Sequence, residues 1–243
     1  MLGLFSKNPR PLVALKLGGN PLPWLPSAKH LGITTDSSVD GLKTDLKIKR
    51  ADYISKNIEI LQEFGFSHPR TKIMINSVYN SHLSGSCLWD LFSKEAVQME
   101  NSWNVSMRLM LNVPRETHRR FIEPLSQVMH AKILMMKRFL TFLQQIQKSP
   151  KKASKFLLET IIKDTRSTTG SNLRNILLLT QKSSVLELVP NDVISLKYNQ
   201  LPDEEAWKVK IIQELIEVKN QNLEVEPLRY QEIDDMLEYI CIF

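Results

Sequence analysis

The chain has 243 residues, of which 42% are hydrophobic, so it is long enough to bury a core in one large or two small domains. Its apolar runs fall short of the roughly 20 residues that cross a bilayer, and Met1–Phe5 is too short for the core of a signal peptide. We therefore expect an intracellular protein, nuclear or cytoplasmic, without a membrane segment. The two cysteines, Cys87 and Cys241, are too few for a disulfide framework or a metal cage, which agrees with a reducing compartment.

Charge divides the chain into two parts. Residues 1–182 hold 27 Lys and Arg against 13 Asp and Glu, a net charge of +14, whereas residues 183–243 hold 5 against 13, a net charge of −8. A basic body favours binding of a polyanion. The alternative is that these charged side chains simply lie on solvent-exposed helix faces. We place a soft domain boundary near residue 182. The acidic tail, 183–243, is a candidate surface for a basic protein partner or for the body of the chain itself.

The first 38 residues are typical of a β-hairpin. Leu12–Leu17 is strand-like, Gly18–Pro21 carries turn residues, and Leu31–Ile33 is expected to return as the second strand. The prolines of Pro21–Pro26 exclude a central strand there, because a proline lacks the amide donor of a strand ladder.

From residue 39 to residue 182 the helical period predicts one basic bundle. Its first helix is expected to begin after Asp40 and to end near Gly65, and a second to begin at Pro69. A third, capped by Ser93, should stop before Pro114. The stripes that should be buried on the first and third helices are Leu42, Leu46, Ile54, Ile58 and Leu61, and Ala96, Met99, Trp103, Met107 and Met110, respectively.

Further helices are expected over 117–148, over 150–164 with Ser149 as the N-terminal cap, and over 172–180. Residues 181–202 form a weakly patterned connector.

Two helices are expected in the acidic tail. The first should be amphipathic, and the second should cover 228–241. The fold class is therefore mainly α, a helical bundle preceded by a short β-hairpin and followed by an acidic helical tail. The side chains expected on one side of the first tail helix are Trp207, Ile211, Ile212, Leu215 and Val218.

The sequence shows no constellation with catalytic or metal-binding geometry. Of the scattered histidines only His82 lies near a second ligand, Cys87, and no further ligand pair completes a zinc site. The N-terminal glycines lack the lysine and hydroxyl of a phosphate-binding loop, and no nucleophile elbow occurs. Asp234 and Asp235 would serve a polymerase only on a hairpin beside a third carboxylate, and they fall in a stretch of helical period. We expect no enzymatic activity, no metal and no cofactor.

Basic side chains on the predicted helices are the candidate nucleic-acid-binding residues. Lys43, Lys47 and Arg50 are spaced four and three apart, so they share one helical face that could follow a phosphate backbone. Aromatic residues fall mostly on apolar stripes, so we expect them in the core and not in base reading. The full candidate set is Lys43, Lys47, Arg50, Arg115, His118, Arg119 and Arg120.

Several short segments carry patterns that occur together in one family. Ser27–Asp36 contains Lys-His-Leu-Gly-Ile-Thr-Thr-Asp, Tyr79–Trp89 contains Ser-Gly-Ser-Cys-Leu-Trp, and Leu111–Arg119 contains Val-Pro-Arg-Glu-Thr-His-Arg. In this order they resemble the region after the catalytic palm of non-LTR (LINE-type) retrotransposon reverse transcriptases, over residues 4–145. Further matches are Leu4–Asn8, Lys49–Ala51, and Trp103 with Arg108.

The resemblance implies a thumb, formed by the helices after Asp40, that holds a template–primer duplex by its backbone. The family's catalytic aspartates would precede residue 1, so the chain resembles an RNA-directed DNA polymerase without its active site. His30 replaces the family's usual aromatic residue, and Ser84 stands where tyrosine is common. By the same resemblance, the primer-grip-like residues are His30, Leu31, Gly32 and Ile33.

The expected function is therefore that of a truncated reverse-transcriptase-like retroelement fragment, which binds RNA or RNA–DNA duplex without catalysis. Two alternatives remain open. One is a helical protein–protein adaptor that uses the acidic tail, and the other is a decayed gene fragment without function.

Overall fold

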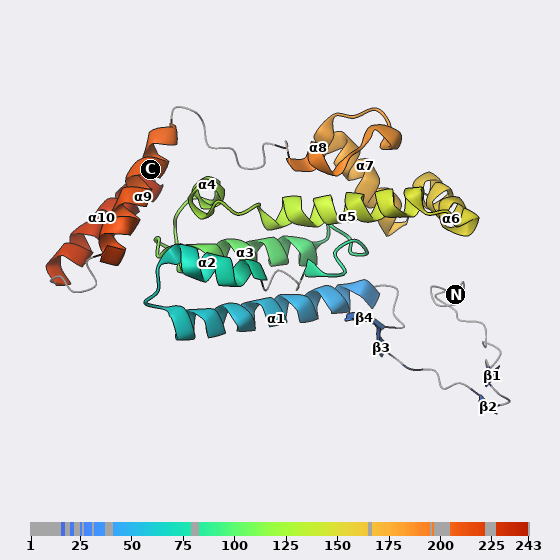
Figure 1. Ribbon diagram of the computed structural model, residues 1–243, viewed down its shortest axis with the longest axis horizontal. Coiled ribbons are helices and arrows are strands. Elements are labelled where there is room, and N and C mark those ends of the chain that lie inside the picture. The colour runs from blue at the N-terminus through green and yellow to red at the C-terminus, as the bar shows by residue number, and fades with distance from the viewer. Residues whose placement is uncertain are drawn as a thin grey trace.

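Helices make up most of the computed structural model, and short antiparallel strands precede them, as the sequence predicts (Figure 1). The structure describes residues 16–17, 20–21, 25, 27–30, 32–36, 41–78, 83–164, 167–194, 196, 205–221 and 227–242.

The N-terminal strands form two short ladders. β1 (Lys16–Leu17) pairs with β2 (Asn20–Pro21), and β3 (Ser27–His30) pairs with β4 (Ile33–Asp36). The expectation of one hairpin closed by a strand at 31–33 is wrong, because the second ladder turns at Gly32. Gly32 has φ +77°, a conformation that favours glycine, so the chain reverses there and Ile33 begins β4.

The first three helices pack side by side, and β4 lies against the first of them (Figure 1). They are α1 (Gly41–Phe64), α2 (Pro69–Val78) and α3 (Lys94–Leu111). The predicted starts at Pro69 and after Ser93 are confirmed. Ser93 Oγ accepts a hydrogen bond from the Ala96 amide at 3.2 Å. The cap expected from Asp40 lies outside the described residues.

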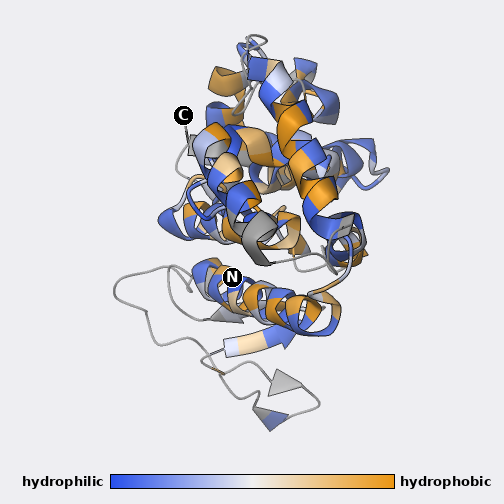
Figure 2. Ribbon diagram, turned by 90° about the vertical axis from the view of Figure 1, so that its left-hand side faces the viewer, coloured by the Kyte–Doolittle hydropathy of each residue, from blue (hydrophilic) through white to orange (hydrophobic). Residues whose placement is uncertain are grey.

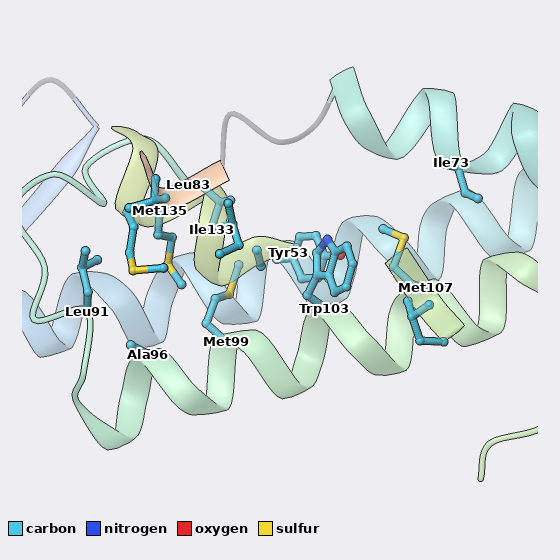
Figure 3. Close-up of a cluster of buried hydrophobic side chains, with 14 of the residues drawn as sticks. Tyr53, Ile73, Leu83, Leu91, Ala96, Met99, Trp103, Met107, Ile133 and Met135 are labelled. Atoms are coloured by element: carbon cyan, nitrogen blue, oxygen red, sulfur yellow. The ribbon is translucent and has the colours of Figure 1, made fainter. Parts of the chain in front are cut away.

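The stripe predicted on α3 is confirmed, since all five of its side chains are buried. Figure 3 shows Ala96, Met99, Trp103 and Met107 along one side of α3, facing Tyr53 of α1. The stripe forms the centre of the bundle core.

The stripe predicted on α1 is partly wrong. Leu42 and Leu61 are half-buried, but Ile54 and Ile58 are 37% and 50% exposed. The helix is rotated so that a polar side chain faces α3, and Asn57 Nδ2 donates to Ser106 Oγ at 2.9 Å. Leu46 is buried as predicted, and the other buried side chains of α1 are Asp45, Tyr53, Asn57 and Ile60.

The next helices run back along α3 and then cover one end of the bundle. They are η2 (Arg119–Phe121), α4 (Ile122–Ser126), α5 (Ala131–Lys148), α6 (Lys152–Lys163) and α7 (Thr168–Thr180). The segment predicted as helical over 117–148 is interrupted at Gln127, which adopts φ 56° at the end of α4. Ser149 ends α5 and does not cap α6, whose N-terminal cap position is Lys151. Ser167 caps α7 by accepting a hydrogen bond from the Gly170 amide.

The connector after α7 contributes to the core. It contains η3 (Val185–Glu187) and α8 (Pro190–Ile194), and α8 packs on α5. Leu188 and Val193 are buried in the same hydrophobic cluster as the rest of the bundle. The core therefore continues past residue 182, where charge alone placed a boundary.

The last two helices, α9 (Ala206–Gln221) and α10 (Pro227–Ile242), form an antiparallel pair at the end of the bundle opposite α6 (Figure 1). The predicted stripe of α9 is partly wrong, because Trp207 and Val218 are 53% and 41% exposed. Ile212 is buried as predicted, and Ile216, which was not expected in the stripe, is buried as well. Figure 2, viewed from this end, shows hydrophobic and hydrophilic positions alternating around the helices, as expected for helices around a shared core.

Candidate nucleic-acid interface

A buried carboxylate holds the second ladder on the bundle. Asp45 of α1 is fully buried, and its Oδ1 accepts a hydrogen bond from the Thr34 amide of β4 at 2.8 Å. Its Oδ2 accepts one from Trp89 Nε1, also at 2.8 Å. Three segments that are distant in sequence therefore meet at one side chain. These two hydrogen bonds tie β4 and the loop before α3 to α1.

Glycine is required where the loop between α2 and α3 meets this junction. Gly85 has φ +92°, and a Cβ atom there would lie 3.3 Å from Ile33 Cγ1 and 3.4 Å from Asp45 Oδ2. A larger residue would strain the backbone and push the loop away from β4. Gly85 of the Ser-Gly-Ser segment and Ile33, which belong to two segments that carry the family resemblance, therefore lie close together.

The primer-grip-like residues form the tip of the β3–β4 ladder. His30 pairs with Ile33 in the ladder and is exposed, whereas Gly32 and Ile33 are half-buried. Leu31 lies outside the described residues. The tip is thus fixed to the bundle through Ile33 and Thr34 and presents His30 at the surface.

The three cations predicted on α1 differ in their surroundings. Lys47 is exposed and Lys43 is half-exposed. Arg50 instead bridges to α3, because its Nε donates to Ser102 Oγ at 2.8 Å and its Nη1 to Gln98 Oε1 at 3.4 Å. Arg50 therefore joins two helices, and the part of this flank that can meet a phosphate backbone is formed by the two lysines.

The second predicted group lies after α3 and is held by internal contacts. Arg108 Nε donates to the carbonyl oxygen of buried Thr117 at 2.7 Å. His118 Nδ1 accepts a hydrogen bond from the Arg120 amide at 3.3 Å and so caps η2. Incomplete hydration of its ring and then the positive charges of the nearby arginines lower the pKa of His118. Arg115 and Arg119 are exposed.

Arg120 is engaged by the C-terminal helices. Its Nη2 lies 2.9 Å from the Glu205 carboxylate, and its guanidinium carbon lies 5.2 Å from the centre of the Phe121 ring. A second contact of the same kind joins His68 Nε2 to the Glu217 carboxylate at 3.2 Å. The α9–α10 pair is therefore anchored beside the cations at 115–120.

The predicted candidates do not form one surface. Lys43 and Lys47 lie in the first turns of α1, near β4, whereas Arg115–Arg120 follow the far end of α3 (Figure 1). The rise of an α-helix puts roughly 20 Å between the Gln98 turn, which contacts Arg50, and Leu111 at the end of α3. The structure separates the set into two groups at opposite ends of the bundle.

Two further cations are structural. Lys132 donates from Nζ to the Leu91 carbonyl and lies 4.1 Å above the Phe92 ring. Lys72 donates to the Gly65 carbonyl and to Asn112 Oδ1, both at 3.3 Å. Burial lowers the pKa of both amines. Part of the positive charge that sequence counting assigns to the surface is therefore inside the fold.

Exposed lysines occur on several elements at the end of the bundle that lies away from α9–α10, seen at the right of Figure 1. We call this group the basic end. All of its members except the one on β3 lie on segments for which the sequence predicts a helix. The basic end consists of Lys29, Lys43, Lys47, Lys148, Lys151, Lys152 and Lys155, of which Lys43 is half-exposed and the others are exposed.

Within the described ranges, no three His, Cys, Asp or Glu side chains gather in an arrangement that could hold a metal ion. Asp234 and Asp235 lie in α10, as the helical period predicts, and Asp234 pairs with Lys219 of α9. None of the helices in the described part of the chain combines the length and hydropathy needed to cross a membrane.

Comparison of the chain with protein-family models, with curated proteins and with solved structures found no match. The resemblance to LINE-type reverse transcriptases therefore stays a prediction that rests on the short segments.

Proposed function

We propose that this chain binds RNA or an RNA–DNA duplex through the sugar-phosphate backbone, without catalysis, and that the basic end makes the contacts. The observation that carries the proposal is that β3, the first turns of α1, the end of α5 and α6 all carry exposed lysines and lie at one end of the bundle, opposite the α9–α10 pair. Lysines spread over several elements can contact phosphates on both strands of a duplex, and each contact releases a condensed counterion. Arg115, His118, Arg119 and Arg120 are left out of this interface, because they lie at the other end.

The proposed relation to the thumb region of LINE-type reverse transcriptases is supported by contacts among the matched segments. Thr34 and Trp89 belong to two of these segments and share the carboxylate of Asp45. Arg108 and Thr117 belong to two others and are joined by a hydrogen bond. Matched residues that contact one another across the fold would be expected if the short patterns reflect one structural unit.

The binding proposal predicts a steep salt dependence that originates at the basic end. We expect the affinity for a labelled RNA–DNA duplex to fall strongly with salt, measured by fluorescence anisotropy at several salt concentrations. The double variant Lys43→Glu with Lys47→Glu should reduce the slope of log affinity against log salt by about 2, since each lost phosphate contact accounts for roughly 0.9.

The matched control is Arg115→Glu with Arg119→Glu, which reverses the same number of charges at the other end. It should leave the slope nearly unchanged. Equal losses in both double variants would contradict the assignment to the basic end, and absence of binding at low salt would contradict the function itself.

The adaptor remains a second candidate because the α9–α10 pair exposes large hydrophobic side chains. Trp207, Met236 and Tyr239 are 53%, 51% and 71% exposed. An adaptor would lose its protein partner when this pair is removed, whereas nucleic-acid binding at the basic end would persist.

Truncation after Leu196 is therefore expected to change duplex affinity at physiological salt by less than about threefold, since α9 and α10 lie at the other end of the bundle and charges farther apart than a Debye length of about 8 Å are largely screened. The cut at 196 keeps Leu188 and Val193 in the core, and circular dichroism would verify the helices. An increase of tenfold or more in affinity would instead indicate that the acidic helices compete with the nucleic acid for its site.

A further inference from the structure

A pocket lies between the loop that follows α2 and the middle of α5. Its volume is about 420 Å³, within the range of roughly 300–1,000 Å³ that is usual for small-molecule sites. One wall is the Ser84–Cys87 segment, and the other is the face of α5 that carries Lys137, Arg138 and Phe142. Because Ile33 lies close to Gly85, the pocket adjoins the tip of the β3–β4 ladder.

The polar part of the pocket suits an anion. Lys137 and Arg138 are adjacent cations, both half-buried, and no Asp or Glu belongs to the described lining. Ser86 is 1% exposed, and its Oγ has no hydrogen-bond partner. A buried hydroxyl without a partner is unfavourable, and a ligand oxygen that accepts its proton would remove that cost. Phosphate oxygens meet this need and pair with both cations.

The remaining lining suits a flat apolar group. Leu83, Leu134 and Phe142 contribute hydrophobic surface, and Gln145 offers an amide that can donate and accept hydrogen bonds at a base edge. Stacking of a base on an aromatic side chain is favourable and tolerates different bases. A ligand with an anion at one side and a base at the other is a nucleotide.

We propose that this pocket binds one nucleotide unit, with its phosphate on Lys137 and Arg138 and its base against Phe142 and Leu134. The inference rests on the proposed function in one respect, namely that the nucleotide belongs to the bound RNA or RNA–DNA duplex. The basic end would hold the duplex, and the pocket beside the ladder tip would take an unpaired nucleotide that extends from it.

The test uses the intact chain and adenosine 5′-monophosphate as the probe, with inorganic phosphate and adenosine as partial ligands, measured by titration in NMR. The mononucleotide should bind more tightly than either partial ligand, because it engages both parts of the pocket. Lys137→Gln should weaken it about tenfold, the loss expected for one charge-assisted hydrogen bond. Phe142→Leu should weaken the mononucleotide and leave inorganic phosphate unchanged.

The control is Lys163→Gln, which removes one exposed lysine on α6 outside the pocket and should not alter the titration. Equal binding by Lys137→Gln and the unsubstituted chain would overturn the proposal. Binding of inorganic phosphate as tightly as the mononucleotide would overturn the assignment of a base to the apolar wall.

Two duplexes, one blunt and one with an overhang, allow the pocket proposal and the proposed function to be tested separately. A duplex with a short single-stranded overhang should bind more tightly than the blunt duplex, and Lys137→Gln should remove that gain alone. If the blunt duplex binds and the overhang adds nothing, the pocket proposal fails and the proposed function stands. If the mononucleotide binds and the blunt duplex does not, the proposed function fails and the pocket remains.

Discussion

Replacement of Asp45 by alanine is expected to lower the free energy of unfolding by about 3 kcal/mol, measured by urea denaturation followed by circular dichroism. The substitution removes two hydrogen bonds to a fully buried carboxylate. It also leaves the Thr34 amide and Trp89 Nε1 without their acceptor inside the fold, and an unpaired buried donor costs more than the bond itself contributes. Because the ladder is attached through this side chain, β4 should also lose protection from amide hydrogen exchange.

Asp45→Asn separates the contribution of charge from that of shape. An amide side chain can accept from one of the two donors, but its NH₂ group then faces the other, so we expect an intermediate loss. Asp52→Ala, at an exposed position of the same helix, is the matched control and should change stability by less than about 0.5 kcal/mol. A loss below about 1 kcal/mol for Asp45→Ala would mean that the junction does not hold the ladder.

Acidification is expected to destabilise the fold through His130. The side chain is 1% exposed, its ring meets Trp103 edge-on with centroids 4.8 Å apart, and its Nδ1 accepts a hydrogen bond from the Lys132 amide. Burial, and then the charges of Arg119 and Lys132, lower the pKa of His130 from 6.5 to about 4. Glu100 approaches to 3.8 Å, but the buried imidazole stays neutral at physiological pH.

A folded-state pKa below the unfolded value means that the unfolded chain binds the proton first. The stabilising contribution is therefore complete above pH 6.5 and is lost as the pH falls from there towards about 4. At about 1.4 kcal/mol for each pH unit of separation, the loss should reach about 3 kcal/mol when the imidazole is protonated in both states. Urea denaturation across this range measures the loss directly.

His130→Asn provides the control for this pH dependence. Asparagine does not titrate, and its side-chain oxygen can still cap α5, so this variant should lose stability less steeply below pH 6.5 than the unsubstituted chain. The difference between the two curves isolates the imidazole from the carboxylates, which titrate in both proteins. Parallel curves would contradict the role assigned to His130.

Local signals in the sequence were sufficient to predict the fold class and most helix boundaries. The cap at Ser93 depends only on an oxygen placed three residues before the amide of Ala96, and the sequence contains that spacing. The five apolar positions of α3 fall on one face, and all are buried, because no other face of that helix offers a comparable stripe. The Pro69 start of α2 and the helix around Asp234 were predicted for similar local reasons.

Where local signals were ambiguous, contacts between helices decided the outcome. The helical period of α1 allows either of two faces to be buried. One face carries Ile54 and Ile58, and the other carries Tyr53 and Ile60. The hydrogen bond from Asn57 to Ser106 selects the second face. The N-terminal turn was misplaced for a related reason, since several glycines and prolines could reverse the chain. In the fold, the turn lies at Gly32, and Ile33 lies close to Gly85.

The sequence by itself determined that the chain is a helical bundle with a basic body, because helical periods, caps and charges depend on neighbours along the chain. Only the tertiary structure decided which cations are accessible. Arg50, Lys72 and Lys132 donate to Ser102, Asn112 and Leu91, partners that lie 52, 40 and 41 residues away and come within reach only when the helices pack. The same packing separated the predicted cations into two ends and brought the Ser-Gly-Ser loop against α5, which no spacing in the sequence indicates.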